Sequence, residues 1–198
     1  MHAPPLWRLL LAASALVALA LPSRRAAAQP YADPGTGAGV IGAISRSPDA
    51  SGSSAAVLAH VLTRLTGAVG VELAAGYRQE RYAVTSDGRA HDLDVREIPV
   101  QLSLLFYLLP NARVQPYLLG GGAYYRVNVE DVDPNGDAVS TGSNKFALHV
   151  GAGVDIRLTS RLSLRADGRY VFLDVDAVSA YDKTANYWQA GLGFNVYF

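Results

Sequence analysis

The 198-residue sequence contains no cysteine, which excludes several kinds of protein at once. Without cysteine there can be no disulfide framework, no thiolate metal site and no anchor of the lipoprotein kind. An excess of positive charge is also missing, because 17 Lys and Arg residues face 17 Asp and Glu residues. A balanced charge of this kind excludes a basic nucleic-acid-binding protein.

Long apolar runs are missing except near the N-terminus. There Leu9 to Leu21 gives about thirteen nearly all apolar residues, short of the ~20 that a spanning helix needs. Arg8 precedes the run and three alanines end at Ala28, so residues 1–28 are predicted to be a secretory signal peptide; an N-terminal anchor is the alternative. Removal of residues 1–28 takes away three basic and no acidic residues, which leaves an exported chain with a net charge of −3.

The rest of the sequence alternates between apolar and polar residues. In "KFALHVGAGVDIRL" (145–158) every even position is apolar, whereas the odd positions include Lys145, Asp155 and Arg157. A helix would scatter these charges around its axis, whereas a strand places them on one face. The closing stretch from Trp188 to Phe198 follows the same rule. Similar alternation occurs at about 36–47, 54–65, 69–82, 97–108, 115–130 and 162–172.

An even number of alternating segments, each about ten residues long, is typical of a membrane barrel. Short links at 65–68, 109–113 and 159–161 alternate with longer polar links at 84–92, 131–144 and 174–186. In such barrels short turns face the periplasm and long loops face the exterior. After a short segment at 29–34, we therefore expect residues 35–198 to form an all-β, eight-stranded antiparallel up-and-down transmembrane β-barrel.

Outward aromatic rings should gather at the two interfaces of the membrane. The expected outer level consists of Tyr77, Tyr125, Phe146, Tyr170 or Phe172, and Trp188. The expected periplasmic level consists of Phe106, Tyr117 and Phe198. The closing stretch 188–198 has an aromatic and aliphatic outward face, which is favourable in lipid. This last strand must also pair with the first strand, so that the barrel has no open edge.

Three stretches, "VQPYLLGGGAYY", "LSLRADGRYVF" and the closing "GLGFNVYF", resemble strands of the small OmpA-like outer-membrane β-barrel family. The resemblance implies an outer-membrane location, with membrane lipids and lipopolysaccharide as surroundings. It also implies that Phe194, Val196 and Phe198 form the C-terminal signal read by the barrel-assembly machinery. Because the sequence stops at Phe198, we expect no periplasmic domain for tethering the cell wall.

Charged residues on the inner faces should pair with one another, because an eight-stranded barrel is just wide enough for side chains to fill. The charged residues expected inside are Arg64, Glu72, Arg78, Glu80, Glu97, Arg126, Glu130, Asp155, Arg157, Arg165, Asp167 and Arg169. The glycines expected inside are Gly120, Gly122, Gly151, Gly153, Gly191 and Gly193. A static, side-chain-plugged interior is the first hypothesis. A gated pore in which Glu72 and Arg165 form a switchable ion pair is the alternative, as the OmpA resemblance suggests.

Two motifs could carry other chemistry. His91, beside Asp92 and Asp94, could belong to a surface hydrolase, but no second acidic pair accompanies it, so a solvated loop is expected. The stretch 131–142 has calcium-loop spacing except at Gly142, where a bidentate Glu is required, so a polar turn is preferred to a weak calcium site. His60 and His149 are expected to point inward.

We therefore expect a structural outer-membrane protein that displays loops for membrane integrity, adhesion or defence, with no catalysis and no cofactor. A small gated channel for ions or small solutes is the alternative, and a soluble lipocalin-like binder would need an apolar interior. The sequence specifies neither the ligands of the loops nor the oligomeric state. It also suggests a bulge near Phe172, because Leu173 and Val175 continue an apolar series on odd positions.

Overall fold

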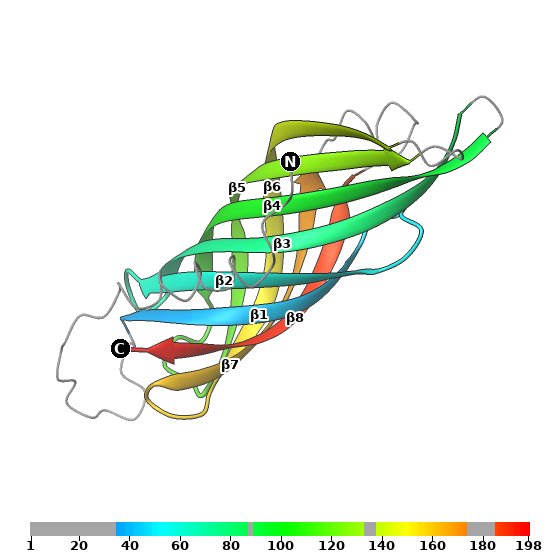
Figure 1. Ribbon diagram of the computed structural model, residues 1–198. Helices are drawn as coiled ribbons and strands as arrows, with labels where there is room; N and C mark the ends of the chain where they lie inside the picture. The colour runs from blue at the N-terminus through cyan, green and yellow to red at the C-terminus, as the bar shows by residue number, and fades with distance from the viewer. Residues whose placement is uncertain (1–34, 87–88, 133–137, 174–184) are drawn as a thin grey trace.

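The computed structural model describes residues 35–86, 89–132, 138–173 and 185–198. Within them eight strands form one closed barrel, in which each strand pairs with the next and β8 returns to β1 (Figure 1). The strands are β1 (Thr36–Arg46), β2 (Ser54–Arg64), β3 (Val69–Ser86), β4 (Arg89–Tyr107), β5 (Val114–Val132), β6 (Ala138–Arg157), β7 (Leu162–Leu173) and β8 (Tyr187–Tyr197). All pairs are antiparallel, which confirms the predicted fold class.

The last strand closes the barrel against the first. Gly37 pairs with Tyr197, and Arg46 pairs with Trp188 at the other end of the seam. The backbone N–H of Phe198 donates to the carbonyl oxygen of Thr36 at 3.0 Å, so the pairing continues past the end of β8. Closure matters because an open edge in hydrocarbon leaves costly unpaired amide groups.

The wall is apolar on its outside over a continuous band. Leu102, Leu148 and Leu192 are 57, 67 and 72% exposed, and both chain neighbours of Leu102 and of Leu148 are buried. So many exposed leucines around a closed sheet would be unfavourable in water. In the described ranges no helix is long and apolar enough to span a bilayer.

Four strands are longer than the sequence pattern predicted. β3, β4, β5 and β6 have 18, 19, 19 and 20 residues, and their paired ends project beyond one end of the barrel (Figure 1). The prediction of loops at 84–92 and 131–144 was therefore wrong, since Ser86 pairs with Arg89 and Val132 with Ala138. An arm that stands outside lipid has water on both faces, so it needs no period-two alternation and its sequence gives no strand signal.

The two faces of β5 are the reverse of the prediction. Tyr117 and Tyr125 are buried inside the barrel, whereas Arg126 is exposed on the outside. Gly120 and Gly122 share the outer face with Arg126. The prediction placed the charged residues of β5 inside, because both faces of the strand are otherwise apolar. These charged residues lie near the hairpin end of β5, where the outer face is no longer in lipid and can carry charge.

The inner face of β7 changes from charged to apolar without a bulge. Arg169, Val171 and Leu173 are all buried at odd positions, and β7 keeps a continuous register with β6 up to Leu173. The predicted bulge near Phe172 is therefore wrong for the described part of the strand. Val175 lies outside the described residues.

Candidate functional site: the charged interior

Among the residues that the structure describes, five basic and five acidic side chains lie inside the barrel, all at least nine-tenths buried. They are Arg64, Arg78, Arg157, Arg165, Arg169, Glu72, Glu80, Glu97, Asp155 and Asp167. The assignment of Arg126 and Glu130 to this group was wrong, because both lie on the outer face of β5, where Glu130 forms an ion pair with Arg96 at 3.1 Å. The charges inside still balance, as a closed polar core requires.

The central group joins β3 to β7 across the lumen. Arg165 forms an ion pair with Glu72 and donates its Nε–H to the Tyr117 hydroxyl at 2.7 Å. Arg169 donates to Asp167 at 2.8 Å and approaches the second oxygen of Glu72 at 3.6 Å. Two arginines and two carboxylates thus form a closed four-membered network whose side chains have at most 1% of their surface exposed.

Neutral polar side chains surround this network. The amide oxygen of Gln101 accepts from Arg169 at 2.8 Å, and its amide nitrogen donates to Tyr125 at 3.2 Å. On the other side, Asn195 and the His60 ring meet through Oδ1 and Nε2 at 2.5 Å. The first contact ties β4 to the central group, and the second joins β2 to β8. Asn195 also donates to Asp155 at 3.3 Å, which links this pair to the charges on β6.

A second group lies closer to the long hairpins. Arg78 donates to Glu97 at 2.9 Å and to Ser45 at 2.8 Å, and it forms an ion pair with Glu80. Glu80 also accepts from the backbone N–H of Ser47 at 3.1 Å. One arginine therefore holds two carboxylates, and the Ser47 amide satisfies the second oxygen atom of Glu80.

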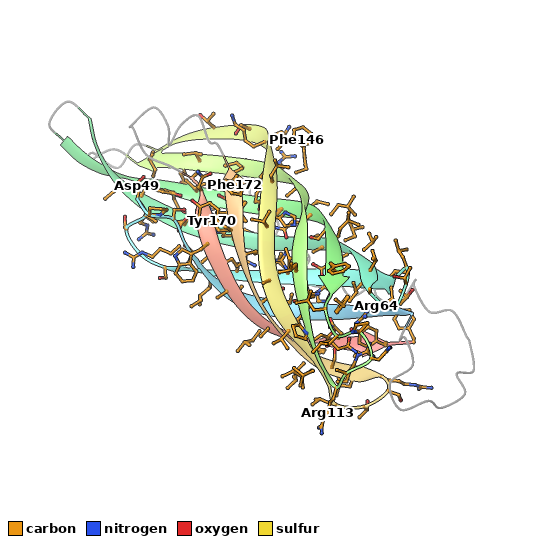
Figure 2. All side chains as sticks on the ribbon, turned by 180° about the vertical axis from the view of Figure 1, so that it is seen from behind. Asp49, Arg64, Arg113, Phe146, Tyr170 and Phe172 are labelled. Atoms are coloured by element: carbon orange, nitrogen blue, oxygen red, sulfur yellow. The ribbon has the colours of Figure 1, made fainter. Side chains whose placement is uncertain are left out.

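A third group lies near the short turns, where arginines stack on tyrosine rings. The Arg64 guanidinium lies 3.3 Å from the centre of the Tyr107 ring, and that of Arg157 lies 4.4 Å from the centre of the Tyr197 ring. The Tyr197 hydroxyl donates to Asp155 at 2.7 Å. Figure 2 places Arg64 near this end of the barrel and Arg113 at its turn. A guanidinium over an aromatic face is stabilised without a carboxylate.

Apolar layers lie on both sides of the central charges, and the sequence did not predict them. Toward the hairpins Tyr82, Leu93, Tyr125, Val127 and Leu173 belong to one buried cluster. Toward the short turns the buried cluster consists of Leu62, Leu105, Tyr107, Tyr117, Leu119 and Tyr197. The reversed face of β5 supplies residues to both layers. The available signal was that the buried inner positions of β5 carry no charge, whereas the inner faces of β3 and β7 do.

The interior also holds a serine next to a histidine. Ser103 on β4 and the Nε2 atom of His149 on β6 are 2.8 Å apart, and both residues are almost fully buried. The Nδ1 atom of His149 has no hydrogen-bond partner among the described residues, so no acid orients the ring as a nucleophile–base pair requires. The pair is enclosed and gives no support for hydrolysis.

The other motifs lie on the projecting arms. His91 is part of β4 and pairs with Val84, so it does not lie in a loop. Asp131 pairs with Val139 and Asn128 with Gly142, so both ends of the 131–142 stretch are hairpin strands and not a calcium loop; residues 133–137 lie outside the described ranges. Among the described residues, no group of three or more His, Cys, Asp or Glu side chains is arranged to hold a metal ion.

Aromatic rings on the outer wall occur near both ends of the lipid-facing band. Phe146 is 83% exposed, and it lies with Tyr170 and Phe172 on the part of the wall nearer the hairpins (Figure 2). Phe106 and Phe194 are exposed toward the short turns. The expected positions of Tyr117 and Tyr125 in these levels were wrong, because both rings point inward. Tyr124 takes the outward place on β5 instead.

The fold and its inverted polarity, apolar outside and charged inside, define a β-barrel of the outer membrane. Residues 9–198 match the family described as outer membrane protein beta-barrel domain, and the chain belongs to this family. It is a small OmpA-like barrel, and it is located in the outer membrane, in contact with membrane lipids.

Solved structures of the same fold come from several Gram-negative bacteria. Neisserial surface protein A is 20% identical, with a TM-score of 0.56, and the match covers 82% of this chain and 96% of that one. OprG from Pseudomonas aeruginosa is 16% identical, with a TM-score of 0.59 and coverage of 83% and 96%. Ail, the attachment invasion locus protein of Yersinia pestis, is 17% identical, with a TM-score of 0.52 and coverage of 83% and 97%. A comparison with curated proteins gave no match.

Proposed function

We propose that this protein is a structural barrel whose interior is sealed by its own side chains and whose long hairpins are displayed outside the cell. The observation that carries the proposal is the layered interior, in which the network of Glu72, Arg165, Asp167 and Arg169 lies between two buried apolar clusters. We expect charged side chains held between apolar layers to leave no continuous aqueous path among the described residues. No catalysis is part of the proposal.

The displayed part consists of the paired arms of β3–β4 and β5–β6. These hairpins project beyond one end of the barrel (Figure 1), and their outer faces carry charged pairs such as Arg96 with Glu130. A rigid ladder holds its tip further from the membrane than an irregular loop of the same length. Such arms suit contact with surfaces or molecules outside the cell, in adhesion or defence.

Two partners belong to the proposal. Phe194 and Val196 expose their side chains on the outer face of β8, and with Phe198 they would be read by the barrel-assembly machinery during insertion. Lipopolysaccharide would surround the hairpin end of the barrel. Nucleic acid has no part in this role.

Conductance in planar lipid bilayers tests the sealed interior. The purified wild-type barrel is expected to give no reproducible channels. Glu130→Ala, which removes a charge on the outside, serves as the matched control for Glu72→Ala and Arg165→Ala. The proposal would be overturned by regular conductance of the wild type that depends on the central ion pair. In that case Glu72→Ala or Arg165→Ala would enlarge or abolish the conductance, and Glu130→Ala would leave it unchanged.

A small gated channel for ions or small solutes is the second candidate. The observation that favours it is that Glu72 Oε1 and Arg165 Nη2 have no hydrogen-bond partner among the described residues. Glu72 can also exchange between two cations, because Arg169 approaches its free oxygen at 3.6 Å. The same conductance experiment separates the two candidates.

A further inference from the structure

The outer wall of the barrel contains an apolar groove on the side formed by β3 to β7. The groove has a volume of about 550 Å³. Its walls include Leu73, Leu102, Tyr124, Phe146, Leu148 and Phe172. Apart from one tyrosine hydroxyl, these side chains offer only methyl groups and aromatic rings, so the groove suits an aliphatic ligand.

The floor of the groove exists because β5 has glycine where its neighbours have large side chains. Gly122 pairs with Leu102 on β4 and with Leu148 on β6, and one step lower Gly120 lies between Leu104 and Val150. A Cβ atom at Gly122 would find only the carbonyl oxygen of Ala147, at 3.9 Å. Large aliphatic side chains of β4 and β6 thus flank a short strip of bare backbone at Gly120 and Gly122.

Aromatic rings close the end of the groove nearer the hairpins. Tyr124 and Phe146 meet edge to face with ring centres 5.3 Å apart, and Tyr170 and Phe172 do so at 4.9 Å. Figure 2 shows Phe146 and Phe172 far from Arg113, which marks the opposite end of the barrel. Aromatic rings of this kind settle at the level of lipid head groups.

A cation lies directly beyond these rings. Arg126 is the next outward residue of β5 after Tyr124, and it is exposed. Its neighbour Arg96 is held by Glu130 at 3.1 Å and Asp94 at 3.7 Å, whereas Arg126 forms no ion pair within the described ranges. The wall therefore presents an apolar groove, an aromatic border and an exposed guanidinium, in that order.

We propose that this groove binds one acyl chain of lipopolysaccharide and that Arg126 holds a phosphate of the same molecule. A lipid with a chain and a phosphate presents its groups in the same order, and guanidinium groups bind phosphate through charge-assisted hydrogen bonds. The choice of lipopolysaccharide rests on the proposed orientation, in which the hairpins face the exterior and this end of the groove lies in the outer leaflet. The site would hold a specific lipid in place on one side of the barrel.

The test measures binding of fluorescent lipopolysaccharide to the purified full chain in detergent. Gly122→Leu fills the groove, and Gly42→Leu is its matched control, because Gly42 is exposed on β1 at the opposite wall and a Cβ atom there meets nothing within 4 Å. Arg126→Gln removes the cation, and Arg113→Gln removes an exposed one at the other end. Heat-modifiable migration on gels establishes that each variant is folded.

The expected result is about tenfold weaker binding for Gly122→Leu and for Arg126→Gln, as the loss of one buried chain or one charged contact implies. Gly42→Leu and Arg113→Gln should bind as the wild type does. Removal of the lipid phosphates should weaken binding to the wild type and leave binding to Arg126→Gln unchanged.

Equal binding by all four variants would overturn the proposal, as would binding of phosphatidylethanolamine by the wild type that is as tight as binding of lipopolysaccharide. If Gly122→Leu instead converts a dimer to a monomer at unchanged lipid binding, a second copy occupies the groove and the proposal is wrong. None of these readings depends on conductance. Conductance of the kind described above would therefore overturn only the proposed function. Failure to bind lipopolysaccharide would overturn only the proposed lipid site.

Discussion

Arg165 on β7 forms an ion pair across the lumen with Glu72 on β3, a residue 93 positions earlier in the chain. Both side chains are fully enclosed, and both have a further partner in the same network, since Glu72 approaches Arg169 and Arg165 contacts Asp167. The pair therefore connects two distant strands at the centre of the barrel. Removal of one partner should therefore lower the free energy of unfolding more than removal of a partner from a pair on the surface.

Loss of one partner should be far more damaging inside than outside. Glu72→Ala leaves buried arginines with too little negative charge and should lower the free energy of unfolding by about 3–5 kcal/mol. Glu130→Ala breaks an exposed pair with Arg96 and should cost less than about 1 kcal/mol. Urea unfolding in phospholipid vesicles, followed by tryptophan fluorescence, measures both. Similar losses for the two variants would contradict the assignment of inner and outer faces.

The charge-balanced double variant sharpens this comparison. Glu72→Ala with Arg165→Ala should cost less than the two single losses together, because no unmatched charge remains in the interior. The same unfolding series gives the coupling energy. A strictly additive result would show that Glu72 and Arg165 do not interact in the folded barrel.

The lipid-facing wall can be tested with two leucines of nearly equal exposure. Leu102 in the middle of β4 is 57% exposed, and Leu109 in a short turn is 56% exposed. In lipid, Leu102→Arg should cost about 2–4 kcal/mol, whereas Leu109→Arg near the interface should cost about 0–1 kcal/mol. Folding into vesicles at increasing urea concentration provides the measurement. Equal and small effects would mean that water, and not acyl chains, surrounds β4.

Adjacent glycines of β5 should respond differently to the same substitution. A Cβ atom at Gly121 would collide with the backbone of Leu102 and Ser103, whereas one at Gly122 has open space. Gly121→Ala should therefore lower the free energy of unfolding by about 1–3 kcal/mol, as overpacked cores do. Gly122→Ala should have almost no effect. The reverse order would show that the faces of β5 are assigned wrongly.

The C-terminal ring should matter more for assembly than for stability. Phe198→Ala keeps the backbone hydrogen bond to Thr36 and should still fold into vesicles in vitro, but its amount in the outer membrane of cells should fall severalfold. Phe106→Ala, which removes an exposed ring near a short turn, should leave that amount unchanged. If Phe198→Ala reaches the outer membrane at wild-type levels, the residue is not part of an assembly signal.

Residue alternation alone predicted the fold and much of the interior. On β7 the odd positions Arg165, Asp167 and Arg169 point inward as expected, because one face of that strand is charged and the other is apolar. β5 could not be assigned in the same way, since both of its faces are apolar in the membrane. Contacts across the lumen, such as Arg64 over the Tyr107 ring, depend on strand stagger that no single segment encodes.

The central claim is that the interior of the barrel is sealed from water, and thiol labelling tests it most directly. Because the chain has no cysteine, a single introduced thiol is the sole site of reaction. Ser103→Cys places it in the enclosed interior, and Ser53→Cys places it at an exposed position before β2. A small water-soluble thiol reagent should label Ser53→Cys at once and Ser103→Cys only after unfolding in urea. Equally rapid labelling of both variants in the folded barrel would contradict the account.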